Sequence, residues 1–248
     1  MRRTGYRDIG FPTYRLPPAV KWLLIVNVGI FVLDFFAKVW FGANLFEFFQ
    51  LIPGLVVRGA IWELVTYMFL HDGVGHVLLN MLFLWFLGVD LEQDWGTRRF
   101  LRYYFLCGIG AGLCVVLVAL LRPIEMYVPT LGASGAILGL VLAYGVLYPD
   151  RIILFMLIFP MKAKYFAMIC GAIAFLGSWQ PGGGVSHVAH LGGMLFGYIY
   201  LKSQLKLNLF DPIGAVRRQY RNWRMERARR RFQVYLRKRG PGNDRFVN

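Results

Sequence analysis

The sequence predicts an all-α, polytopic membrane protein built as a bundle of six transmembrane helices. Of its 248 residues, 57% are hydrophobic and only 17% are charged, whereas soluble domains carry about 45–50% apolar and about 25% charged residues. Six apolar stretches approach the roughly 20 residues that cross a bilayer. This composition disfavours an intrinsically disordered chain. The 3 cysteines all lie in apolar stretches, which excludes a disulfide scaffold.

The six predicted spans differ in length and character. The first is predicted to be a retained span, because no small-residue cleavage pattern of a signal peptide follows it. The last three are short, rich in glycine and carry polar residues, which favours packing inside the bundle over contact with lipid. A seventh apolar stretch, Arg151–Pro160, is too short to span and ends in proline, so we expect an interfacial connection there. The spans are expected at about 20–41, 63–88, 100–121, 132–148, 163–179 and 186–203.

The distribution of basic residues predicts the orientation, because Lys and Arg accumulate in cytoplasmic segments. They are frequent before the first span and in the connections after the second and fourth spans, and sparse in the alternate connections. Six spans place both termini on one side, and both terminal segments are basic. We therefore expect a cytoplasmic N-terminal segment at 1–19, a membrane core at 20–203 and a basic cytoplasmic tail at 204–248.

The tail accounts for most of the net charge of +15. In it, Val216, Tyr220 and Trp223 recur at helical spacing with arginines between them, as in a basic amphipathic helix that rests on anionic lipid. A solvated tail that only enforces topology has the same composition. Nucleic-acid binding is not expected, because no fold or motif supports it.

The four histidines of the chain fall in only two places, the pair His71 and His76 and the pair His187 and His190. Polar groups inside a bilayer are costly and therefore indicate function. His76 and Asn80 are four residues apart and project from one helical face. Two such donors could hold an oxyanion. The alternative is a helix–helix hydrogen bond worth about 1 kcal/mol.

A serine stands at the expected start of the fourth span. Ser134 lies between Gly132 and Gly135, and glycines leave a hydroxyl unshielded and allow close approach of another chain. Free backbone N–H groups and the positive end of the helix dipole coincide there, which suits a nucleophile whose reaction builds negative charge. A serine helix cap beside close packing is the alternative.

Matching glycine patterns predict that the fourth and sixth spans are neighbours. Gly135-x-x-x-Gly139 and Gly193-x-x-x-Gly197 are small-residue patterns that let two helices pack closely. A histidine near the start of the sixth span could then face Ser134 and act as its base. No acidic residue is placed to orient that imidazole, so we expect a dyad rather than a triad.

Taken together, these motifs resemble the rhomboid family of intramembrane serine proteases. The matching text is W-x-L-V-T-x-M-F-L-H from Trp62, H-x-x-x-N-M-x-x-L-W-x-x-G from His76, GASG from Gly132 and AHLGGxxxG from Ala189. The resemblance covers roughly residues 20–203, and the order of the motifs agrees with the family. It implies the six-span rhomboid fold and cleavage of membrane-anchored protein substrates near the outer membrane face.

The resemblance also implies roles for single residues. Ser134 matches the nucleophile and His190 the general base, with His187, one turn earlier, as the competing candidate for the base. His76 and Asn80 match the pair that stabilises the oxyanion. The remaining matched positions are structural or packing residues: His71, Gly132, Gly135, Gly193 and Gly197. Glu92 resembles a family glutamate that braces the inner end of the second span, and we expect it in a loop.

Two departures from the family pattern and two competing functions stay open. Asp72 precedes Gly73 in an unusual but peripheral arrangement, and Glu63 stands after Trp62 where an arginine is common. A rhomboid-like pseudoenzyme that binds transmembrane helices would share the fold. A histidine-based metal transporter is disfavoured, because no HExxH motif and no deep carboxylate accompanies the histidines. We expect no cofactor or metal, and we expect a multi-pass protein of the bacterial inner membrane.

Overall fold

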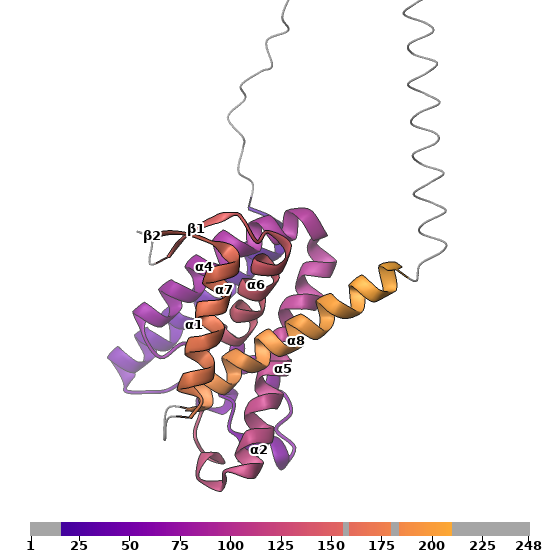
Figure 1. Ribbon diagram of the computed structural model, residues 1–248. Helices are drawn as coiled ribbons and strands as arrows, with labels where there is room; N and C mark the ends of the chain where they lie inside the picture. The colour runs from indigo at the N-terminus through magenta and orange to yellow at the C-terminus, as the bar shows by residue number, and fades with distance from the viewer. Residues whose placement is uncertain (1–15, 156–158, 180–183, 210–248) are drawn as a thin grey trace, which may run out of the picture. The chain divides into compact units, whose positions relative to one another are not determined.

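The computed structural model describes residues 16–155, 159–179 and 184–209, and most of these residues are helical (Figure 1). Within these ranges, 3 helices are long and apolar enough to cross a membrane: α1 (Pro18–Phe41), α4 (Val74–Trp95) and α5 (Thr97–Leu121). Two shorter apolar helices follow, α6 (Ser134–Leu147) and α7 (Ala163–Gly177). The last helix is α8 (Gly184–Leu209). The chain is therefore a mostly helical, membrane-spanning protein, and a count of six spans remains a prediction.

The predicted position of the second span, 63–88, is wrong at both ends. The first part of this stretch forms two short helices, α3 (Glu63–Thr66) and η2 (Tyr67–Phe69), and α4 begins only at Val74 and continues to Trp95. Tyr67 and Met68 are buried, so their hydrophobicity reflects packing of a connection within the protein. Hydropathy alone does not distinguish an apolar segment that is buried within the protein from one that spans the membrane.

The connection between α1 and α4 holds the segment that leads into α6. Two hydrogen bonds join the backbones of Leu51 and Thr130, at 2.9 and 2.8 Å. Further along, the Gly132 N–H donates to the Tyr67 carbonyl at 2.9 Å. This connection therefore fixes the main chain just before Ser134. Besides α3 and η2, it contains η1 (Glu47–Phe49) and α2 (Pro53–Val57).

Glu63, one of the two departures from the family pattern, is buried in the same connection with 1% of its surface exposed. Its Oε2 accepts a hydrogen bond from the Ile52 N–H at 2.8 Å. Burial raises the pKa of the Glu63 carboxyl, and the bond from Ile52 partly opposes that rise. The acid therefore has a structural role in this connection.

Helix α5 packs on α6 through small residues and the buried Tyr103, and η2 packs on α5 through the buried Tyr67. The Tyr67 hydroxyl donates to the Gly108 carbonyl, and the Tyr103 hydroxyl donates to the Gly139 carbonyl, both at 2.7 Å. A Cβ at Gly139 would come within 2.5 Å of the Cys107 sulfur. Close approach of α5 and α6 therefore depends on glycine. The short helix η3 (Pro123–Glu125) follows α5.

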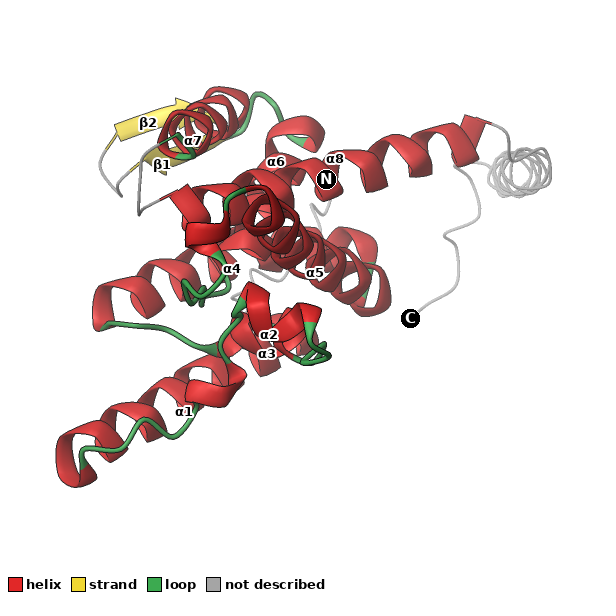
Figure 2. Cartoon of the chain, turned by 90° about the horizontal axis from the view of Figure 1, so that it is seen from below, coloured by secondary structure: helices red, strands yellow, loops and turns green. Residues whose placement is uncertain are grey.

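The stretch between α6 and α7 is a β-hairpin rather than an irregular connection. Strand β1 (Ile152–Phe155) pairs antiparallel with β2 (Phe159–Lys162), with Ile152 opposite Lys162, and the hairpin lies beside α7 (Figure 2). Just before it, Asp150 accepts hydrogen bonds from Lys162 and Lys164 at 3.1 and 3.3 Å. These two ammonium groups lower the pKa of the Asp150 carboxyl. The expected position of the connection is correct, and its strand pairing was not predicted.

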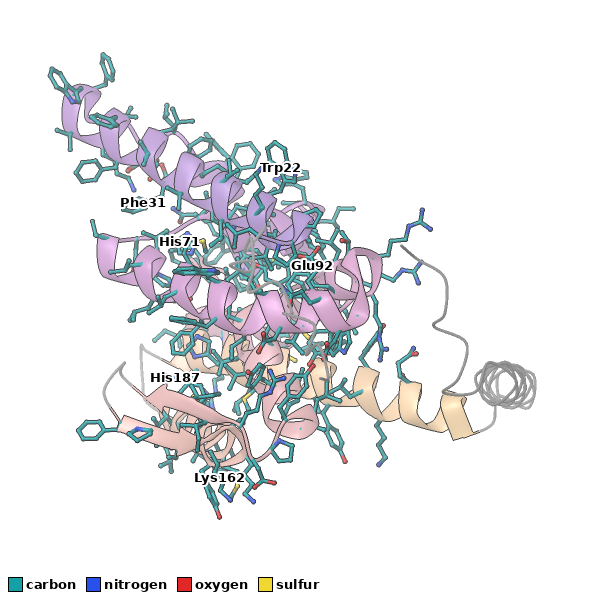
Figure 3. All side chains as sticks on the ribbon, turned by 90° about the horizontal axis from the view of Figure 1, so that it is seen from above. Trp22, Phe31, His71, Glu92, Lys162 and His187 are labelled. Atoms are coloured by element: carbon teal, nitrogen blue, oxygen red, sulfur yellow. The ribbon has the colours of Figure 1, made fainter. Side chains whose placement is uncertain are left out.

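Glu92 lies within α4, not in the loop that the sequence analysis expected, and it binds the start of α1. Its side chain is 2% exposed. Its two oxygens accept the N–H groups of Ala19 and Val20, at 2.9 and 2.8 Å. These donors have no partner within their own helix, because they belong to its first turn. Glu92 therefore caps α1 from a neighbouring helix, and Figure 3 shows it beside that helix.

Candidate active site

The predicted site residues lie on three helices, α4, α6 and α8, or in the segments just before α4 and α6. Ser134 is the first residue of α6, as expected, and its side chain is half-buried. Gly132 has a φ of +120°, a conformation that residues with a Cβ rarely adopt. The chain therefore turns at Gly132 and presents the Ser134 hydroxyl at the helix N-terminus, where backbone N–H groups have no helical partner.

The structure brings Ser134 and His190 together. The Ser134 Oγ and the His190 Nε2 are 2.8 Å apart, and both side chains are half-buried. This distance is that of a hydrogen bond between a hydroxyl and an imidazole. With Nε2 as the acceptor, the hydroxyl donates its proton to the ring, which is the geometry of a nucleophile and its base.

Glycines allow α6 and α8 to come close enough for this bond. A Cβ at Gly193 would overlap the Gly135 carbonyl oxygen, and a Cβ at Gly135 would lie 2.6 Å from the Ala111 Cβ of α5. The expected contact between the two glycine patterns is therefore present. Gly197 packs in the same way against the Tyr103 hydroxyl.

His187 lies one turn before His190 and has different surroundings. Its ring packs against Gly177 at the end of α7, where a Cβ would overlap it. Its Nδ1 is buried without a hydrogen-bond partner among the described residues. The rings of His187 and His190 are nearly perpendicular, with centroids 5.9 Å apart. The hydrogen-bond partner of Ser134 is thus His190, and His187 contacts α7.

His76 and Asn80 of α4 converge on the backbone that precedes Ser134. A Cβ built at Gly132 would lie 2.7 Å from the His76 Nε2 and 3.7 Å from the Asn80 Nδ2. Asn80 is 5% exposed, and its Nδ2 is a buried donor without a partner in the described part of the chain. A buried donor without a partner is costly. Asn80 therefore presents an unpaired donor near Gly132 in the described structure.

His71 supports His76 by packing. Its side chain is buried, and its ring lies edge-on to that of His76 with centroids 5.1 Å apart. Neither ring nitrogen has a hydrogen-bond partner within the described ranges. Figure 3 shows His71 near α4 and His187 well apart from it. Among the described contacts, His71 makes no hydrogen bond with Ser134 or with His190.

The sequence analysis missed the contact of Asp72 with this group of residues. The Asp72 Oδ1 and the His76 Nδ1 are 2.6 Å apart. In the sequence, this aspartate stands out only as a peripheral departure from the family pattern. Asp72 lies before the start of α4, so helical spacing does not predict this contact, and its closeness to His76 in the sequence was the available signal.

Comparisons with known proteins point to one family. The family model described as the Rhomboid domain matches residues 58–206. The chain is 29% identical to the mitochondrial Rhomboid protein 1 of Saccharomyces cerevisiae over 181 residues, which are 72% of this chain and 51% of that protein. It is 26% identical to Rhomboid-like protease 3 of Toxoplasma gondii over 198 residues, or 78% of this chain and 72% of that protein.

A plant relative gives the same result over a shorter region. The chain is 34% identical to RHOMBOID-like protein 1 of Arabidopsis thaliana over 148 residues, which are 58% of this chain and 35% of that protein. The chain thus spans about half the length of the yeast relative and about a third of the plant relative. The matched region, 58–206, contains every residue of the site described above.

Proposed function

The chain belongs to the rhomboid family, and from this premise we propose that it is an intramembrane serine endopeptidase with Ser134 as nucleophile and His190 as general base. The observation that carries the proposal is the hydrogen bond of 2.8 Å between the two side chains. Both members of the dyad are present and in contact, which favours a protease over a pseudoenzyme that only binds transmembrane helices.

The reaction follows from this contact. The Ser134 Oγ attacks the carbonyl carbon of the scissile peptide bond while the His190 Nε2 takes the hydroxyl proton. The tetrahedral intermediate collapses to an acyl-enzyme, and His190 delivers the proton to the leaving amine. Water, activated by the same ring, then attacks the ester, which releases the new carboxyl end and restores Ser134.

The negative oxygen of the intermediate needs donors near the start of α6. Three are available: the His76 Nε2 and the Asn80 Nδ2, which both approach Gly132, and the Ser134 backbone N–H at the helix N-terminus. Donors that are in place before the reaction stabilise the developing charge without reorganisation. This arrangement explains why the buried amide of Asn80 has no partner within the part of the chain that the structure describes.

The substrates we propose are membrane-anchored proteins that are cut near the outer face. A peptide bond in a regular helix is shielded by its own hydrogen bonds, so a transmembrane substrate must unwind locally. Unwinding in lipid leaves backbone groups unpaired at several kcal/mol each, and glycine or proline in the substrate lowers the cost of leaving the helix. The narrow approach between the glycines around Ser134 suits a small residue just before the cut.

The topology we propose has six spans and cytoplasmic termini, in an integral membrane protein. The starts of α4, α6 and α8 then share the outer side, and this agreement supports the arrangement.

A relative in yeast is named as mitochondrial and one in Arabidopsis thaliana as chloroplastic, so the comparisons do not support the bacterial inner membrane expected above. We propose contact between the basic tail and anionic lipid, although the tail beyond residue 209 lies outside the described residues. Residues 181–183 of the glycine-rich stretch before α8 also lie outside the described residues.

The test is cleavage of a model single-span substrate by purified protein. The Ser134→Ala variant should lose cleavage completely while its thermal midpoint stays close to that of the wild type, because the half-buried hydroxyl contributes little packing. Mass spectrometry should place the wild-type cut near the outer end of the substrate helix, after a small residue. Cleavage by Ser134→Ala at the wild-type rate would refute the proposed function. Equal cleavage of a substrate whose Gly and Pro residues are replaced by Leu would refute the unwinding step.

A further inference from the structure

Asp72 stands next to the site without a role in the reaction described so far. It lies just before the start of α4, and its side chain is 72% exposed, while that of His76 is 29% exposed. Its Oδ1 is 2.6 Å from the His76 Nδ1. Two acceptors would repel each other at this distance, so a proton lies between them. The His76 Nδ1–H therefore donates to the Asp72 carboxylate.

This bond restricts what the other ring nitrogen can do. A neutral imidazole carries one proton, and with that proton on Nδ1 the Nε2 holds a lone pair. The Nε2 faces Gly132, just before Ser134, where the oxyanion of the proposed reaction forms. A lone pair there would repel the oxyanion. Only the doubly protonated ring donates to Asp72 and to the oxyanion together.

We propose that Asp72 is a positioning residue that holds His76 as an imidazolium, with its Nε2–H directed at the oxyanion. The inference rests on the proposed function and adds a residue to it. A charged donor makes a hydrogen bond roughly twice as strong as a neutral one. The negative charge of Asp72 balances the imidazolium, so the site gains a cationic donor without an unpaired charge.

Among the titratable groups described near His76, Asp72 is the one that can balance the charge of the imidazolium. The titratable neighbours in the described ranges are Asp72, His71, whose ring centroid is 5.1 Å away, and His190 on α8, which interacts with His76 electrostatically. Residues 132–135, at the start of α6, include no titratable side chain. Asp72 is thus the one acid among these groups.

The experiment compares Asp72→Asn with the wild type in the purified full-length protein, using kcat and KM for a single-span substrate. The amide keeps an acceptor for Nδ1–H but removes the charge. We expect kcat to fall about 10-fold at pH about 8 with KM unchanged, and to fall much less at pH about 5.5, where an imidazole is protonated without help. The control is Asp150→Asn, an exposed carboxylate beside the β-hairpin, which should match the wild type at both pH values.

A merely structural role would give different results. Asp72→Asn would then lower kcat by the same factor at both pH values, together with the thermal midpoint, and this outcome would overturn the inference. A second measurement uses His76→Gln as the background. There Asp72→Asn should have no further effect, because the two residues act as one unit. An equal loss with and without His76 would also overturn it.

The two proposals fail in different ways. If Ser134→Ala still cleaves the substrate, the proposed function fails and the role of Asp72 fails with it. If Ser134→Ala is inactive while Asp72→Asn keeps the wild-type kcat at pH about 8, only the inference on Asp72 is overturned.

Discussion

Gly193 of α8 lies against the carbonyl oxygen of Gly135 in α6, so closely that a Cβ at Gly193 would overlap that oxygen. The neighbour is backbone, which cannot rotate away as a flexible side chain could. Ser134 precedes Gly135 by one residue, and His190 precedes Gly193 by three. The distance between the two helices therefore sets the distance between the two members of the dyad.

Gly193→Ala should push α8 away from α6 and weaken both folding and catalysis. Overpacking of a dense interior costs about 1–3 kcal/mol, and we expect a lower thermal midpoint together with a kcat loss of at least about 10-fold. The control is Gly29→Ala in α1, where a Cβ meets nothing within 4 Å. An unchanged kcat in Gly193→Ala would contradict the view that this contact sets the dyad.

The two histidines of α8 can be separated by substitution. His190→Ala should lose activity as completely as Ser134→Ala, because the nucleophile then has no base, and general-base catalysis contributes about 100- to 10,000-fold. His187→Ala should keep a measurable fraction, since His187 contacts Gly177 and makes no hydrogen bond to Ser134 in the described structure. The measurement is the single-turnover cleavage rate. If His187→Ala lost activity completely and His190→Ala kept a measurable fraction, the general base would be His187, one turn earlier in α8.

Asn80→Ala should lower kcat and leave KM nearly unchanged. Removal of one oxyanion donor in a soluble protease costs about 100- to 1,000-fold in kcat. We expect a smaller loss here, because His76 and the Ser134 N–H remain. Asn27→Ala is the matched control: this buried asparagine of α1 donates to the Leu23 carbonyl at 2.7 Å, so it should alter stability alone. A tenfold rise in KM with kcat intact would place Asn80 in substrate docking instead.

Glu92→Ala should destabilise the attachment of α1 to α4. The substitution leaves the N–H groups of Ala19 and Val20 without an acceptor in a buried place, and each such group costs about 1–3 kcal/mol. Thermal unfolding in detergent should show a lower midpoint, whereas the exposed Glu47→Ala should be close to the wild type. An unchanged midpoint in Glu92→Ala would mean that water replaces the carboxylate at this helix start.

The residues of the site could be predicted because polar groups are rare in apolar spans. Ser134, His190, His76 and Asn80 each stand out against a hydrophobic background, and the glycine patterns predicted which helices meet. These signals are local in the sequence, and helical periodicity converts them into directions in space.

Other features depend on contacts between distant segments, and the sequence alone does not contain them. The start of α4 at Val74 was missed because buried residues of the preceding connection are as apolar as a span. The pairing of Leu51 with Thr130 joins segments that are far apart in the chain. Asp72 was undervalued because its bond to His76 depends on how the chain enters α4.

The position of the nucleophile depends on main-chain hydrogen bonds, those between Leu51 and Thr130 and that from Gly132 to Tyr67. Such bonds survive most replacements of the side chains that carry them. The connection between α1 and α4 can therefore accept replacements at its exposed positions, such as Phe48 and Val57, while the serine stays in place. Main-chain hydrogen bonds thus place the reacting centre without restricting the exposed side chains of the segment that holds it.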